Sequence, residues 1–248
     1  MERVGELEVQ SATESLIDWW AMAGVTNAVA EEPVNWLQPA RPPASPVAQI
    51  AELEAAAPAW PQSLDAFHDW LAADGGLPEL AWPQMSGRSR RILPVGQRVP
   101  SLMVVCDMPD PEDMETGTLL SGEAGKLFDA MLAVIGSQRS DVYLSSLAVA
   151  RPAGGIISEN DAAQLANRMR HHMALVAPRQ VLVMGDKASR ALLPTVDAGN
   201  IIGLRPLNHQ GGILNSVAIM HPRVLLKQPT AKMQVWRQLQ LLKKAQAE

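Results

Sequence analysis

The sequence is short of cysteine and of aromatic residues, and these shortages exclude some classes of protein. The 248 residues include one cysteine, Cys106, and only 4% aromatic side chains. A single cysteine allows neither an intramolecular disulfide nor a cysteine-ligated metal cluster. Cys106 ends an apolar run, so we expect a buried structural side chain there rather than a nucleophile.

Long hydrophobic runs and an excess of positive charge are also missing. No apolar stretch approaches the roughly 18 residues of a membrane-spanning helix. The first residues, MERVGELEVQ, lack the features of a signal peptide, so we expect a cytoplasmic protein. The net charge of −5 counts against a constitutive high-affinity nucleic-acid binder, which needs lysine and arginine for phosphate contacts. It leaves room for a local basic patch.

Residues 1–100 are expected to form an N-terminal extension of short helices and proline-rich chain. Residues 13–23 have the pattern of a short amphipathic helix, and the proline density over residues 33–61 predicts an extended tether. A second helix is predicted over residues 63–73, with Ser63 as its N-cap. The tryptophans of this extension favour docking of a protein partner or packing on the chain's own core, and for Trp70 we expect the core.

Residues 101–248 alternate between strand and helix patterns. This order predicts a three-layer α/β/α domain with a central, mostly parallel four-stranded sheet. The predicted strands cover residues 102–106, 142–148, 180–184 and 217–220, and the predicted helices cover residues 122–135, 159–176, 187–193 and 230–247.

Polar residues follow the first and the last of these strands. Asp107 comes directly after the apolar strand 102–106, and His221 follows strand 217–220. In an open α/β sheet, ligands bind at the carboxyl ends of the strands, so we expect one site to which both segments contribute. The segment that begins with Asp107 holds five acids in nine residues, residues 107–115. These acids suggest metal binding or general-base catalysis, and for all but Asp107 a solvated acidic loop is an equal alternative.

Four segments resemble, in order and spacing, the motifs of the uracil-DNA glycosylase superfamily. The likeness covers residues 101–242 and is closest to the iron–sulfur group, whose first motif reads GEAPG, then an acid, then G-x-P-F-x-G-x-x-G. The segments are CDMPDPEDMETGTLLSGEAG (residues 106–125), VYLSSLAVARP (142–152), PRQVLVMGDKA (178–188) and HPRVLLKQPTAKMQVWRQL (221–239).

The resemblance implies a monomeric DNA repair enzyme that hydrolyses the N-glycosidic bond of uracil or a related deaminated base. It implies that the Asp107 carboxylate positions water and stabilises a cationic sugar, and that His221 donates a hydrogen bond to the departing base. It also implies DNA as the partner. From the residues themselves we expect no membrane contact, no cofactor and no metal, because no apolar run is long enough to span a membrane and a single cysteine cannot hold an iron–sulfur cluster. The implied substrate contacts are Pro109, Leu120 and Ser146. Arg223, just after His221 and Pro222, is a further candidate that would contact a phosphate beside the lesion, and a plain surface arginine is an equal alternative.

The chain departs from the family pattern at several of these positions. Asp107 replaces a glutamate, Leu120 an aromatic residue that stacks on the base, and Ser146 an asparagine that reads the base edge. We therefore expect weaker base capture and weaker discrimination between uracil and cytosine. Asp110 stands at a glycine position. Ala150 and Leu165 stand where two cysteines would hold the iron–sulfur cluster, which excludes the cluster.

Three functions remain open from the sequence. An active glycosylase is placed slightly ahead of a catalytically weak or inactive module of the same fold that binds DNA or a repair or replication protein. An unrelated nucleotide-binding domain comes last, because the sequence has no glycine motif that would cradle phosphates.

Overall fold

The computed structural model describes residues 60–73, 76–82, 91–193 and 203–247. The predicted helix at residues 13–23, and the tether at residues 33–61 except its last two residues, lie outside the described residues. Ala59–Glu248 forms one compact unit. No helix within the described ranges is long and apolar enough to cross a membrane.

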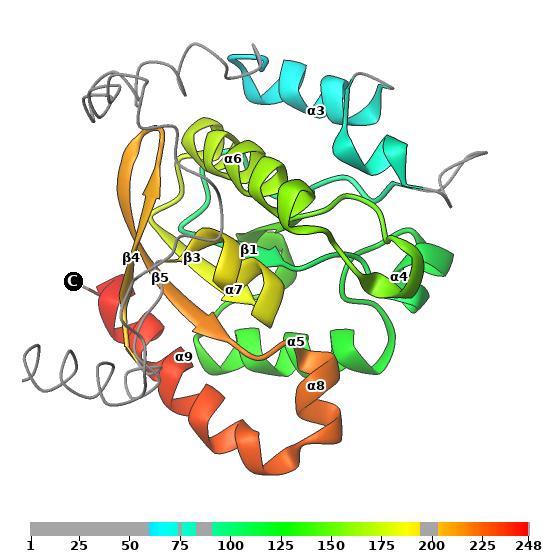
Figure 1. Cartoon of the computed structure of the whole chain (residues 1–248). Helices are drawn as coiled ribbons and strands as arrows, with labels where there is room; N and C mark the ends of the chain where they lie inside the picture. The colour runs from blue at the N-terminus through cyan, green and yellow to red at the C-terminus, as the bar shows by residue number, and fades with distance from the viewer. Residues whose placement is uncertain (1–59, 74–75, 83–90, 194–202, 248) are drawn as a thin grey trace, which may run out of the picture. The chain divides into compact units, whose positions relative to one another are not determined.

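A five-stranded sheet with the order β2-β1-β3-β5-β4 forms the centre of this unit (Figure 1). Strands β2, β1, β3 and β5 run parallel, which confirms the predicted mostly parallel sheet. The fifth strand, which the predicted four-stranded sheet did not include, is β4, and it pairs antiparallel with β5 in a hairpin at the sheet edge. The strands are β1 Leu102–Cys106, β2 Val142–Ser146, β3 Gln180–Met184, β4 Arg205–His209 and β5 Gly212–Ile219.

Helices cover both faces of the sheet, because alternate strand residues point to opposite sides. In β1, Leu102 and Val104 join the core cluster of α5, α8 and α9, whereas Met103 and Val105 join the cluster of α6 and α7. The predicted three-layer α/β/α fold is therefore confirmed. The helices are α5 Gly122–Val134, α6 Glu159–Val176, α7 Asp186–Leu192, α8 Pro222–Lys227 and α9 Lys232–Ala247.

Helix α3 (Leu64–Ala72) packs on the outer side of α6 and confirms the helix predicted at residues 63–73. The Ser63 hydroxyl accepts a hydrogen bond from the backbone N–H of Ala66 and caps the helix. Trp70 packs against a small apolar cluster that includes Phe67, as expected for that side chain. The predicted division of the chain at residue 100 stays a prediction.

Candidate active site at the carboxyl ends of the strands

Asp107 and His221 line one cavity of about 930 Å³ at the carboxyl ends of the strands. Asp107 follows β1 and His221 follows β5, and both strands pair with β3 between them. The structure thus brings together the two segments that the sequence predicts to share a site. The other described residues of the lining come mainly from α7, α8 and α9 and from β4 and β5.

The Asp107 carboxylate lies against the N-terminus of α7. Its Oδ1 accepts a hydrogen bond of 2.7 Å from the backbone N–H of Ala188. Gly185 permits this approach, because a Cβ there would overlap the carboxylate, and its φ of 114° is unfavourable for other residues. Burial raises the pKa of Asp107, although the amides of Ala188 and Lys187 oppose that rise. The result is an oriented and partly desolvated acid.

The His221 ring is buried, with 4% of its surface exposed. It caps α8, and its Nδ1 accepts a hydrogen bond from the backbone N–H of Arg223 at 3.2 Å. Burial, with a smaller contribution from the charge of Arg223, lowers the pKa of His221 to about 4. The imidazole is therefore neutral at pH 7, and since Nδ1 is an acceptor, the proton is on Nε2.

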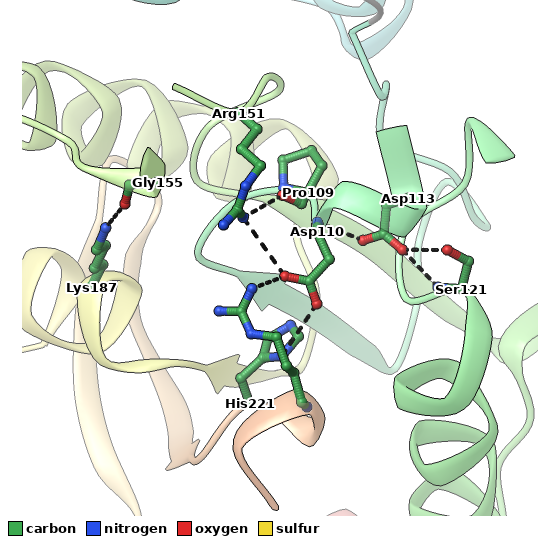
Figure 2. A network of polar contacts seen from close by, with 9 residues as sticks. Pro109, Asp110, Asp113, Ser121, Arg151, Gly155, Lys187 and His221 are labelled. Carbon is green, nitrogen blue, oxygen red and sulfur yellow. Dashed lines mark hydrogen bonds and ion pairs between the residues drawn. The ribbon is translucent and has the colours of Figure 1, made fainter. Parts of the chain in front are cut away.

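Asp110 lies between His221 and two arginines (Figure 2). The Arg223 guanidinium donates to Asp110 Oδ1, Arg151 Nη1 lies 3.7 Å from the same oxygen, and His221 Nδ1 lies 3.9 Å from Oδ2. Arg151 Nη1 also donates to the carbonyl of Pro109 at 3.0 Å. Burial raises the pKa of Asp110, and the positive charge of Arg223 opposes it.

Asp113 fixes the backbone of the acidic loop. Its Oδ2 accepts from the N–H of Asp110 at 3.0 Å, and its Oδ1 accepts from the N–H and hydroxyl of Ser121 at 2.7 and 2.6 Å. This carboxylate is therefore structural, and it holds the N-cap residue at the start of the short helix α4 (Pro111–Thr116). Glu112 and Glu115 are exposed. Within the described part of the chain, no group of three or more acidic, histidine or cysteine side chains is placed to hold a metal ion.

Three predicted substrate contacts lie outside the cavity lining. Pro109 is buried in the loop after β1. Leu120 is 1% exposed and belongs to the core beneath α5, and its carbonyl accepts from Arg139 Nη2 at 2.5 Å. Ser146 is buried, and its hydroxyl donates to the carbonyl of Ala148 at 2.7 Å. A direct base contact by these residues stays a prediction, whereas Arg223 does line the cavity.

Three basic residues of the lining were not predicted from the sequence: Lys187, Arg190 and Arg205. With Arg223 they make four basic side chains, against the two carboxylates of Asp107 and Asp186. Basic side chains therefore outnumber carboxylates in the described lining, although Arg223 pairs with Asp110, which is not part of the lining, and the chain carries a net charge of −5. The Lys187 ammonium donates to the carbonyl of Gly155 (Figure 2). Lys187 could have been predicted from the sequence, because it stands just after strand β3 and the strand-end rule that pointed to Asp107 applies there too.

An open α/β sheet with a cavity at the carboxyl ends of its strands is the architecture of many ligand-binding and catalytic domains. The family model of the uracil DNA glycosylase superfamily matches residues 93–240, more than half of the chain, so the chain belongs to this superfamily. The closer likeness to the iron–sulfur group stays a prediction. The residues present do not fit such a cluster, because the single cysteine, Cys106, is buried inside β1.

Proposed function

We propose that this protein hydrolyses the N-glycosidic bond of uracil or a related deaminated base in DNA. The observation that supports this most is the placement of an oriented carboxylate, Asp107, and a neutral imidazole, His221, on one cavity with a basic lining. The cavity volume of about 930 Å³ lies within the roughly 300–1,000 Å³ of typical small-molecule sites. The target base enters it after rotation out of the helical stack.

In the proposed reaction His221 stabilises the departing base. As the bond between sugar and base breaks, negative charge grows on a base oxygen, and the Nε2–H of a neutral imidazole donates a hydrogen bond to it. The N–H of Arg223 on Nδ1 fixes the required tautomer before the base arrives. Losing one such preorganised donor lowers a rate by about 100-fold or more.

Asp107 acts on the sugar side of the bond. Its ionised carboxylate stabilises the positive charge on the sugar and orients the attacking water, whose proton it accepts as the new C–O bond forms. The amides at the start of α7 hold the carboxylate in place. Because burial raises the pKa of Asp107, activity should fall on the acid side of neutrality as this group takes up a proton.

Release of uracil from a single-stranded oligonucleotide tests the proposal. The wild type should generate alkali-labile abasic sites, and Asp107→Asn and His221→Asn should each lower the rate about 100-fold or more. Glu112→Gln is a matched control, because it neutralises an exposed acid of the same loop that does not line the cavity. If the wild type releases no uracil, hypoxanthine or xanthine, the hydrolase proposal is overturned.

A second candidate is a non-catalytic module of the same fold that binds DNA or a repair or replication protein. Three observations favour it: Leu120 and Ser146 are buried outside the cavity lining, and Asp110 pairs with Arg223 beside His221. This candidate predicts retained DNA or protein binding with no base release, and Asp107→Asn would leave that binding intact.

A further inference from the structure

The Asp110 carboxylate is held by two arginines that come from different parts of the chain. Its side chain is 11% exposed, whereas those of Arg151 and Arg223 are 24% and 40% exposed. Arg151 follows β2 and Arg223 is in the first turn of α8, so only the folded sheet brings them together. In Figure 2, Arg151 and His221 approach the Asp110 carboxylate from opposite sides.

Arginine pairs of this kind are suited to phosphate. A guanidinium offers several N–H donors in a planar fork that matches the oxygens of a carboxylate or a phosphodiester. A phosphodiester has the same single negative charge as the Asp110 carboxylate, so exchanging one for the other leaves the charge beside the two arginines unchanged.

We propose that Arg151 and Arg223 form a phosphodiester site for the DNA backbone, and that Asp110 fills this site in the protein alone until a phosphate replaces its carboxylate. This inference rests on the proposed DNA substrate but requires no catalysis.

The local structure allows the carboxylate to leave without unfolding the loop. Asp113 holds the backbone N–H of Asp110, so the main chain stays in place while the side chain rotates. Burial raises the pKa of the Asp110 carboxyl, which means that the ionised form loses hydration in this position and regains it on leaving. The exposed part of Arg223 gives an incoming phosphate access to the cation before the carboxylate has left.

The site would also place the phosphate next to the proposed base pocket. Arg223 and His221 both line the cavity, and Asp110 pairs with Arg223 while its Oδ2 lies 3.9 Å from His221 Nδ1. A phosphate that takes the place of the carboxylate is therefore held beside the imidazole, where the nucleotide with the extruded base has its own backbone. Asp110 then acts as a competitor that weakens binding of every DNA sequence equally, because phosphate contacts carry no sequence information.

Equilibrium binding of Asp110→Asn to a fluorescent single-stranded oligonucleotide without uracil tests this site. Asparagine keeps the shape and the backbone N–H but removes the competing charge, so affinity should rise about threefold to tenfold. The magnitude of the slope of log K against log salt should rise by about 0.7, the value for one more phosphate contact on a single strand. Asp129→Asn is the control: it makes the same change in net charge by removing the carboxylate that pairs with Arg139, outside the cavity lining.

The gain should disappear when Arg151→Gln and Arg223→Gln are added to Asp110→Asn. The proposal is overturned if Asp110→Asn binds no more tightly than Asp129→Asn, if the gain survives loss of both arginines, or if neither protein binds the oligonucleotide. Base release is measured separately on the uracil substrate. Tighter binding by Asp110→Asn without any base release would leave the phosphate site standing and overturn only the hydrolase.

Discussion

Glu79 gives the sharpest test of how the segment before residue 100 belongs to the fold. Its side chain is fully buried and forms a two-pronged ion pair with Arg168 of α6, at 2.5 and 2.9 Å. Glu79 Oε1 also accepts from the N–H of Val149 at 3.0 Å, and Arg168 donates to the carbonyl of Leu147. The pair therefore joins residues 78–81, α6 and the end of β2.

Glu79→Gln should destabilise the protein by about 3–5 kcal/mol, because it leaves the Arg168 charge buried without its counter-charge. That is a large share of the roughly 5–15 kcal/mol that holds a typical domain folded. For a domain of this size it corresponds to a fall in Tm of about 6–20 °C. Removing both charges, in Glu79→Leu with Arg168→Met, should recover most of the loss.

Urea unfolding followed by tryptophan fluorescence measures these differences. Asp65→Asn is the matched control, since it breaks the Asp65–Arg98 pair, whose side chains are 63% and 74% exposed, and should cost under about 1 kcal/mol. A chain cut to residues 101–248 lacks Glu79 and should be unstable for the same reason as Glu79→Gln. A Glu79→Gln protein within about 1 kcal/mol of the wild type would refute the reasoning.

Two further predictions concern the cavity. Gly185→Ala should destabilise the protein by more than Gly136→Ala does. Both replacements meet backbone strain of about 1–3 kcal/mol, but only a Cβ at residue 185 also overlaps the Asp107 carboxylate. Equal losses of stability in urea unfolding would contradict this prediction. Because the pKa of His221 is depressed in the folded protein, the unfolded chain takes up a proton first as the pH falls. The stability that the neutral His221 ring contributes is therefore fully present above about pH 6.5 and is lost as the pH falls through about 4. Between pH 7.5 and 4.5 the wild type should lose about 2–3 kcal/mol more than His221→Asn, and parallel pH profiles would show that His221 is not buried as a neutral ring.

The parts of the fold that could be predicted are those where local pattern and tertiary packing agree. Strand β3 and helix α6 have the predicted bounds, because a continuous apolar run and a long capped helix carry strong local signals. Strand β4 carries Pro206 and little β-branched character, so only its pairing with β5 at the sheet edge makes it a strand.

The same contrast applies to the site. The strand-end rule placed Asp107 and His221 on one cavity, because it depends only on the order and direction of the strands. The burial of Leu120 depends on how α5 packs, and the pairing of Asp110 with Arg223 joins the loop after β1 to the start of α8. Neither contact leaves a periodic pattern in the sequence, since each is a property of the assembled layers.

Asp107 and His221 both have structural contacts that are separate from any chemistry. Asp107 accepts the Ala188 amide at the start of α7, and His221 caps α8 through the N–H of Arg223. A chain that had lost catalysis would still gain stability from both residues, so their presence identifies the fold more firmly than the activity. Asparagine is the informative replacement at both positions, because its side-chain oxygen can accept the same backbone N–H while it removes the negative charge of Asp107 or the Nε2–H donor of His221. Loss of base release in either variant at unchanged stability would therefore report on chemistry alone.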